Sequence, residues 1–241
     1  MYCPCCGSLE MREIPVLWPQ LITEWRLAEY EVAYINRQQG LSCVACGSNL
    51  RSMVLAKSIM AGYGFTGYLK QFIHTEIAKT LHVLEINEAF VLTQFLKELP
   101  NHTLVQYPNV DMMSLPFEEN RFDLVVHSDT LEHVEHPVRG LSEGLRILKP
   151  GGFCAFTVPI IVDRLTISRN GLPSSYHGSP ENPPDNLVYT EYGADAWKQV
   201  IQAGFEECRI FSMDFPAAHA LVGKKENFMV QRMRGQDGIH R

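Results

Sequence analysis

Residues 122–159 read FDLVVHSDTLEHVEHPVRGLSEGLRILKPGGFCAFTVP, and the order of elements within them sets the architecture. Residues 122–127 form an apolar run that is too short for a helix and rich in β-branched residues, so they predict a buried strand. Apolar residues then recur at helical spacing, at Val138, Leu141, Leu145 and Leu148. The KPGG of residues 149–152 ends that helix, and residues 153–159 predict a second buried strand. The stretch is therefore a βαβ unit, whose two strands we expect to be parallel.

The same region resembles the second half of a class I S-adenosylmethionine-dependent methyltransferase of type 11. That family carries an acidic residue before an LPF turn, FDLV on the fourth strand, LEHV after it and LKPGG before the fifth strand. Here these motifs stand in that order, at Asp111 and at residues 115–117, 122–125, 131–134 and 148–152. The resemblance covers about residues 80–235. It implies an α/β fold, a Rossmann-like doubly wound sheet of seven strands between layers of helices.

The remaining elements follow from local patterns. Residues 81–86 predict the first strand, residues 90–99 a helix and residues 103–107 the second strand. Upstream, apolar spacing predicts helices over residues 21–39 and 49–61, the latter with Asn49 as N-cap. Downstream, we expect a helix from Thr190 to Ala203, followed by final strands at 205–213 and 227–233.

The turn after the first strand departs from the family. In place of the family's LE-x-G-x-G-x-G, residues 84–91 read LEINEAFV and contain no glycine. The family's glycines let the backbone approach the methionine part of the cofactor. Without them, either the loop takes another path or side chains fill part of the site. Methyl transfer then requires that Asn87, Glu88 and Phe90 leave the crevice above the strand ends open.

The resemblance implies cofactor contacts where the strands end. Asp111 would accept the adenine amino group, the Met112 amide would meet a ring nitrogen, and Glu85 would bind the cofactor's α-amino group. Further cofactor-binding candidates after the first, second and fourth strands are Ile86, Asn87, Tyr107, His127 and Ser128. Two alternatives stay open, because Glu85 also suits the start of the following helix and Asp111 also suits a turn.

Methyl transfer depends on alignment and exclusion of water more than on a particular acid or base. The catalytic candidates are His133, Asp129 and His177. His133 and Asp129 each have a second interpretation, as solvated residues that orient the helix start. His177 lies in the long polar connection of residues 160–189, where we place acceptor recognition together with Tyr176 and Arg169. The alternative for this connection is a surface excursion that serves contacts in a homodimer.

The N-terminal segment contains two Cys-x-x-Cys-Gly motifs, which place four thiols at Cys3, Cys6, Cys43 and Cys46. Paired thiolates from two such knuckles complete the tetrahedral set of a structural zinc site. The segment resembles a zinc ribbon appended to a methyltransferase, although the gap between its knuckles is long. Cys5 is either a free thiol or a competing ligand, and a redox pair is the alternative to zinc.

Composition limits the class of protein. The 241 residues are 46% hydrophobic and 20% charged, with a net charge of −6, typical of a globular protein. Residues 1–80 carry seven Lys and Arg against six Asp and Glu, which argues against a large nucleic-acid footprint. No apolar run is long enough to span a membrane and no secretory leader is visible, so we expect a cytoplasmic protein. We divide the chain into a zinc-ribbon-like segment (1–60) and a methyltransferase-like domain (61–241).

Two functions are consistent with these patterns. The first is methyl transfer from S-adenosylmethionine to a nucleophile, with a small molecule favoured over nucleic acid as the acceptor. The second is a catalytically inactive methyltransferase-like module that binds or scaffolds, and the glycine-free turn favours it. Fold alone does not decide between them.

Overall fold

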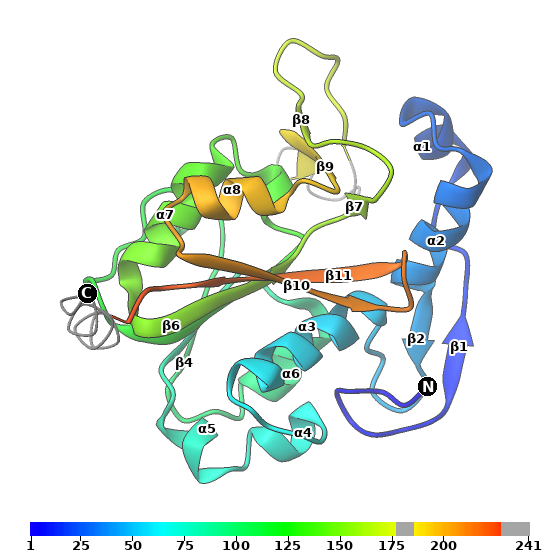
Figure 1. Ribbon diagram of the computed structural model, residues 1–241. Helices are drawn as coiled ribbons and strands as arrows, with labels where there is room; N and C mark the ends of the chain where they lie inside the picture. The colour runs from blue at the N-terminus through cyan, green and yellow to red at the C-terminus, as the bar shows by residue number, and fades with distance from the viewer. Residues whose placement is uncertain (177–185, 228–241) are drawn as a thin grey trace, which may run out of the picture.

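The computed structural model describes residues 1–176 and 186–227, and its centre is a mixed sheet (Figure 1). In spatial order, its six strands are β10 (Glu207–Met213), β11 (Ala218–Lys224), β6 (Leu148–Thr157), β5 (Phe122–Ser128), β3 (Val83–Ile86) and β4 (His102–Val105). The β6–β5, β5–β3 and β3–β4 pairs are parallel, whereas β11 runs antiparallel to both neighbours. Helix α7 (Pro137–Ile147) joins β5 to β6, so the βαβ unit and the α/β fold class are confirmed.

The strand number differs from the prediction of seven, because the described residues form six strands in this sheet. The missing strand would belong to the connection between β4 and β5, where residues 106–121 form turns and bends. A parallel crossover alone takes a dozen or more residues, so this connection is too short to add a strand with its own crossovers. As a result, β4 is the edge strand of the sheet.

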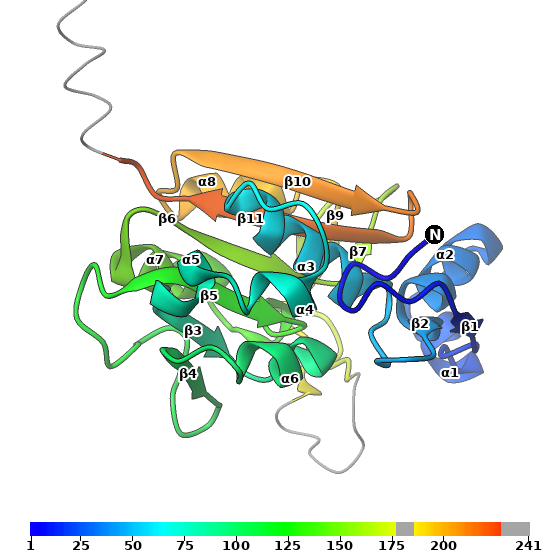
Figure 2. The same ribbon diagram turned by 90° about the horizontal axis from the view of Figure 1, so that it is seen from below.

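Two apolar clusters cover the two faces of the sheet, as alternation along the strands requires. On β5, Leu124 and Val126 belong to one cluster and Val125 to the other. Helices α7 and α8 (Trp197–Gln202) cover one face (Figure 1). The helices on the opposite face are α3 (Leu50–Gly62), α4 (Leu69–Phe72), α5 (Glu76–Thr80) and α6 (Thr93–Leu96), seen from below in Figure 2. A short 3₁₀ turn, η1 (Phe90–Leu92), precedes α6, so the predicted helix over residues 90–99 is shorter and irregular.

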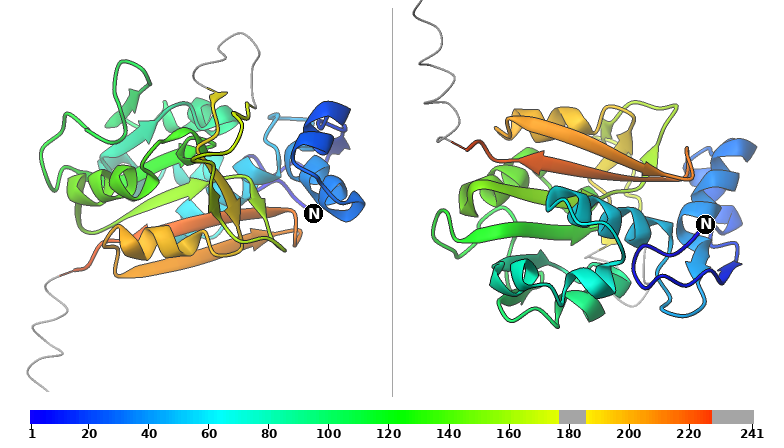
Figure 3. Two further views of the ribbon diagram at one scale, coloured as in Figure 1. Left: turned by 90° about the horizontal axis from the view of Figure 1, so that it is seen from above. Right: turned by 60° about the horizontal axis from the view of Figure 1, so that its bottom comes forward.

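The N-terminal segment lies at one end of the sheet (Figure 3). Strand β1 (Met11–Glu13) pairs antiparallel with β2 (Leu41–Cys43), and between them lie helices α1 (Pro19–Glu24) and α2 (Glu29–Gly40). The single helix predicted over residues 21–39 is thus wrong, because Arg26 takes a left-handed conformation (φ 48°) that interrupts it. By contrast, the Asn49 cap is confirmed, since its side chain accepts a hydrogen bond of 2.9 Å from the Ser52 amide.

The chain after β6 differs from the predictions in two places. Strands β7 (Ile160–Ile161), β9 (Thr190–Gly193) and β8 (Ile167–Ser168) form a small sheet, so Thr190 begins a strand and does not cap a helix. The last strand among the described residues is β11, which the sequence patterns did not predict and whose buried residues pair with β6 and β10. Residues 228–233 of the strand predicted at 227–233 lie outside the described residues.

Candidate functional site

A cavity of about 800 Å³ lies where β3, β4 and β5 end. The residues just after these strands that line it are Ile86, Asn87, Gln106, Tyr107, Asp129 and Thr130. Ligands bind at this edge of doubly wound sheets, outside the carboxyl ends of the strands. The connection between β4 and β5 contributes Val110, Asp111, Met112 and Met113. Five of the eight predicted cofactor-binding residues therefore line one cavity.

The N-terminal segment forms a second wall of this cavity. Its lining side chains are Val16, Leu17, Trp18, Leu21, Trp25, Leu27, Ile35, Gln38, Gln39 and Arg51. Seven of these ten residues are apolar, whereas the strand ends contribute mainly polar groups. The cavity is thus shared between the cysteine-bearing segment and the sheet, with an apolar side and a polar side.

The glycine-free turn after β3 leaves the cavity open. Asn87 adopts a left-handed conformation (φ 55°), which asparagine tolerates better than most non-glycine residues. Its amide donates to the Val105 carbonyl at 2.8 Å, and its side-chain oxygen accepts from the Tyr107 amide at 3.0 Å. Phe90 also has a left-handed backbone (φ 52°), but its side chain is 62% exposed and does not line the cavity. The loop therefore turns without glycine and without filling the crevice.

Glu85 is buried at the end of β3 and faces the start of the following helical turn. Its carboxylate accepts hydrogen bonds from the Ala89 amide at 2.7 Å and the Thr93 hydroxyl at 2.6 Å, and it contacts His102 Nε2 at 2.7 Å. It is not among the described residues that line the cavity. These contacts correspond to the alternative in which Glu85 orders the loop.

His127 and Ser128 are also buried behind the lining. The His127 ring stacks on Phe156 with a centroid distance of 4.7 Å, and burial lowers its pKa to about 3, so the imidazole is neutral. The Ser128 hydroxyl lies 2.7 Å from the Thr157 hydroxyl. Successive side chains of a strand point to opposite faces of the sheet, so these two lie on different faces, and both are buried.

Asp111 combines a turn with a place in the cavity wall. Its Oδ1 atom accepts a hydrogen bond of 2.8 Å from the Met113 amide, which closes an Asx turn. Met112 is buried beside it, and Tyr107 is 56% exposed at the rim. The turn predicted for Asp111 and its position at the cavity thus coexist, since the turn uses one carboxylate oxygen.

Asp129 and Arg51 form an ion pair on the cavity wall, with Nη1 to Oδ1 at 2.5 Å. Asp129 has a left-handed backbone (φ 49°), a strained conformation often found at functional positions. Burial raises the pKa of Asp129, and the Arg51 charge opposes that rise. Behind it, Glu132 is 1% exposed and its carboxyl oxygens have no hydrogen-bond partner among the described residues. Burial raises the pKa of Glu132 well above its ordinary value, which favours the neutral form of this carboxyl.

His133 lines the cavity in a defined tautomer. Its Nδ1 atom lies 2.9 Å from the Leu187 carbonyl, which can only accept, so Nδ1 carries the proton. Burial lowers the pKa of His133, which favours a neutral ring whose Nε2, 3.9 Å from Glu132 Oε1, carries no proton. His177 lies outside the described residues. Arg169 pairs with Glu191, and Tyr176 is 48% exposed; neither lines the cavity.

Arg164 fixes the apolar wall to the segment after β7. Its guanidinium binds Glu31 at 2.8 and 2.5 Å and donates to the backbone carbonyls of Trp25 and Arg26, each at 2.9 Å. Trp25 in turn donates from Nε1 to the Ser175 hydroxyl at 2.9 Å. Sequence reasoning missed both Arg164 and Arg51. A cation in the first turn of a helix opposes the helix dipole, and this is the signal that marks Arg51 in the sequence.

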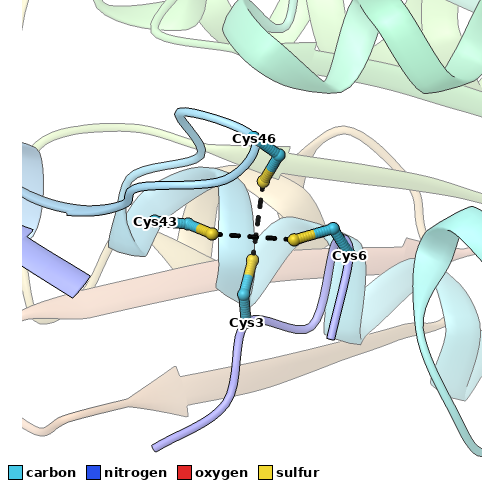
Figure 4. A group of neighbouring side chains, drawn as sticks. All are labelled: Cys3, Cys6, Cys43 and Cys46. Atoms are coloured by element: carbon cyan, nitrogen blue, oxygen red, sulfur yellow. Dashed lines mark hydrogen bonds between the residues drawn. The ribbon is translucent and has the colours of Figure 1, made fainter. Parts of the chain in front are cut away.

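Four cysteines converge at the other end of the N-terminal segment (Figure 4). The Sγ atoms of Cys3, Cys6, Cys43 and Cys46 all lie within 4.8 Å of one another. The β1–β2 ladder brings the knuckles together, because Met11 pairs with Cys43. Cys5 is buried beside them, but its thiol points to the Ser52 carbonyl at 3.8 Å and is not part of this group.

The two knuckles have the same backbone geometry. In each, the amide of the first cysteine donates to the carbonyl of a serine five residues later, at 2.8 Å for Cys3 and 2.9 Å for Cys43. Gly7 and Gly47 both take left-handed conformations, with φ of 86° and 78°. Burial opposes ionisation of Cys43, but hydrogen bonds led by the Cys46 amide lower its pKa to about 7. The thiolate is the form that binds metal.

Comparison with known proteins identifies the class of domain. Residues 59–156 match a family model described as a methyltransferase domain. A demethylmenaquinone methyltransferase of Clavibacter sepedonicus is 39% identical over 66 residues, covering 26% of this chain and 27% of that protein. One from Corynebacterium glutamicum is 29% identical over 133 residues, covering 48% of this chain and 57% of that protein. The chain thus spans less than two thirds of the length of these relatives.

The chain is also similar to solved structures of methyltransferases. A methyltransferase dependent on S-adenosylmethionine from Methanosarcina mazei is 14% identical, with a TM-score of 0.39, covering 65% of this chain and 97% of that one. One from Aquifex aeolicus is also 14% identical, with a TM-score of 0.37, covering 60% and 80%. Residues 59–156 therefore resemble a domain of the methyltransferase class. More narrowly, it resembles type 11 of that class and follows a segment with four clustered cysteines. No helix among the described residues has the length and apolar character needed to cross a membrane.

Proposed function

We propose that the chain transfers a methyl group from S-adenosylmethionine to a small molecule bound in the cavity. The observation that carries this proposal is the open cavity of about 800 Å³ beside the matched motifs, despite the glycine-free turn. Sites for small molecules and cofactors usually measure about 300–1,000 Å³. The volume therefore suits a cofactor and a small acceptor together.

In this proposal, Asp111 and the Met112 amide hold the adenine ring, while Ile86, Asn87 and Tyr107 line the adenosyl site. Glu85, His127 and Ser128 act from behind the lining, by fixing the loop and the end of β5. S-adenosylmethionine would supply an electrophilic methyl group that needs no further activation. The chain's own contribution is alignment of the two reactants and exclusion of water by the apolar wall.

His133 is the proposed base for an acceptor that loses a proton. The hydrogen bond from Nδ1 to Leu187 leaves Nε2 as the proton acceptor, and burial keeps the ring neutral. The proton passes to Nε2 as the acceptor's nucleophilic atom bonds to the methyl carbon. Asp129 pairs with Arg51 and shapes the same wall.

A small molecule is the proposed acceptor class because the second wall of the cavity is apolar. Among the relatives, the demethylmenaquinone methyltransferases act on a small molecule by name. The four cysteines are proposed to bind one structural zinc ion, since four thiolates with S–S spacing within 4.8 Å match a closed tetrahedral set. We place the domain boundary near residue 60, within α3.

Calorimetric titration with S-adenosylhomocysteine tests the cofactor site directly. We expect wild-type protein to bind it and the Asp111→Ala variant to bind about tenfold more weakly, the effect of losing one hydrogen bond to a polar group. Glu119→Ala, an exposed change on the same connection, should bind as wild type does. Absence of binding to the wild-type protein would instead support the inactive scaffolding module.

A further inference from the structure

Arg51 has more hydrogen-bonding capacity than the chain uses. Its side chain is only 9% exposed. A guanidinium carries five N–H donors, but Asp129 is its one recorded partner among the described residues. Its Nε atom is buried without a partner. Buried guanidinium groups are normally paired through several hydrogen bonds, so the described residues leave part of the hydrogen-bonding capacity of Arg51 unused. Because Nε is shielded from solvent, the donors that a ligand in the cavity would meet are those of the Nη atoms.

The position of Arg51 is fixed on the cavity wall. It follows the second cysteine knuckle and stands in the first turn of α3, which the Asn49 side chain caps. It lines the cavity together with the apolar residues of the N-terminal wall, and it contacts Asp129 at the end of β5. Arg51 therefore lies at the junction of the apolar wall and the strand ends.

The nearby carboxyl groups do not occupy all the donors of the Arg51 guanidinium. Asp129 contributes one hydrogen bond from one oxygen. Glu132 lies behind it, and burial raises its pKa well above the ordinary value, which favours the uncharged carboxyl. A guanidinium with unused donors in a cavity that has an apolar wall favours a group that carries negative charge on oxygen.

We propose that Arg51 binds the oxyanion of the methyl acceptor, and that the acceptor is an apolar molecule with an acidic hydroxyl, a phenol or an enol. This inference rests on the proposed function. The hydroxyl proton passes to His133, and an electron pair of the acceptor forms the bond to the methyl carbon. The electron pair of the broken carbon–sulfur bond stays on sulfur, which yields S-adenosylhomocysteine. Arg51 stabilises the deprotonated acceptor throughout, and the apolar body packs on the wall that contains Leu21 and Trp25.

The test uses 4-nitrophenol as a chromogenic acceptor mimic, with the full-length protein saturated in S-adenosylhomocysteine. Absorbance reports the fraction of phenolate as pH is varied. We expect the bound phenol to ionise at least one pH unit below the free phenol, which equals at least a tenfold preference for the phenolate. Arg51→Met should abolish this shift, and Arg51→Lys should retain part of it, since lysine keeps the charge but loses the fork.

Two further variants separate binding from folding. Arg209→Met removes an exposed arginine of β10 and should leave the shift unchanged. Arg51→Met combined with Asp129→Asn removes the pair without leaving a lone carboxylate, so a folding defect of the single variant does not decide the result. An Arg51→Met protein that keeps the full shift, or a wild-type protein that binds neither form of the phenol, overturns the inference.

A second measurement distinguishes the cofactor's own carboxylate as the occupant. Methylthioadenosine lacks the amino-acid part of S-adenosylhomocysteine. If Arg51→Met weakens S-adenosylhomocysteine about tenfold but leaves methylthioadenosine and the phenol shift unchanged, Arg51 binds the cofactor and the assignment to the acceptor is wrong. If wild-type protein binds neither adenosyl compound, the proposed function itself fails, which is a different outcome from loss of the phenol shift alone.

Discussion

The cysteine centre and the cavity differ in how the chain assembles them. All four clustered cysteines belong to two short knuckles, each closed by its own hydrogen bonds and its own left-handed glycine. The cavity instead gathers side chains from segments spread between Val16 and Tyr189, and its walls belong to different parts of the chain. The first site depends on local geometry, whereas the second depends on how distant segments pack.

The N-terminal segment links these two sites, because it carries the cysteines at one end and the apolar wall at the other. Arg164 ties this wall to the segment after β7. If the two sites do differ in this way, loss of the cysteine centre should disturb the apolar wall more than it disturbs the strand ends. The predictions below test this separation.

The largest effect is expected from Cys43→Ser. The variant should lose the bound zinc and several kcal/mol of the free energy of unfolding, because binding to a structural site contributes directly to folding. Elemental analysis and chemical denaturation measure the two quantities. Cys5→Ser is the matched control and should keep one metal ion per chain, since its thiol lies outside the group. A Cys43→Ser protein with full metal content would rule out the zinc site.

His127 provides a pH test of the sheet alone. Its pKa is about 3 in the folded chain and 6.5 ordinarily, so the unfolded chain binds a proton between these values and the folded chain does not. Stability linked to His127 is therefore complete above about pH 6.5 and falls by about 1.4 kcal/mol per pH unit below it. Between pH 6 and 4, urea denaturation should show a smaller loss for His127→Phe than for wild type. Equal losses would show that His127 is not buried in its neutral form.

The cysteine centre, built from local geometry, is easier to predict from the sequence than the cavity, built from distant segments. The knuckles were predicted residue by residue, because Cys-x-x-Cys-Gly fixes its own turn. Among the strand-end residues, Asn87, Tyr107 and Asp111 do line the cavity, since a parallel sheet places strand ends together. Glu85 and His127 were expected to face a ligand but are buried behind the lining. A residue at a strand end can face either way, and motif position does not specify which.

The second wall shows what sequence patterns leave out. The apolar spacing around Leu21 and Trp25 correctly indicated a packed helical surface, but not that this surface closes a cavity. The helix breaks at Arg26, where the backbone is left-handed. The ion pair of Arg164 with Glu31 joins residues more than a hundred positions apart. Likewise, Thr190 is a good helix cap by residue type, yet it pairs within β9. Tertiary pairing overrode local preference there.

Arg164→Met should loosen the wall with an intermediate effect. Glu31 is 3% exposed, and removal of its partner leaves a buried carboxylate unpaired, at a cost of about 2 kcal/mol after allowance for the partly exposed arginine. Burial opposes ionisation of Glu31, but the Arg164 hydrogen bonds prevail and lower its pKa below 4.5. The stabilisation is therefore present above pH 4.5 and is lost as pH falls through the lowered pKa.

Thermal denaturation at neutral and acidic pH measures this effect. The difference between Arg164→Met and wild type should shrink in acid, whereas Arg37→Met, which removes ion pairs at the surface, should change stability by less than about 1 kcal/mol at either pH. If Arg164→Met behaved like Arg37→Met at neutral pH, the ion pair of Arg164 with Glu31 would not hold the wall.

The smallest effect is expected at Asn87, and it tests the loop that replaces the family's glycines. Alanine removes the side-chain hydrogen bond to Tyr107 and must also adopt the left-handed conformation. Glycine removes the same hydrogen bond but adopts that conformation freely. Asn87→Ala should therefore lower the free energy of unfolding by about 1 kcal/mol more than Asn87→Gly. Urea denaturation of both variants measures the difference. Because both lose the same contact, the difference reports the backbone alone, and equal stabilities would mean that the turn after β3 is not left-handed at Asn87.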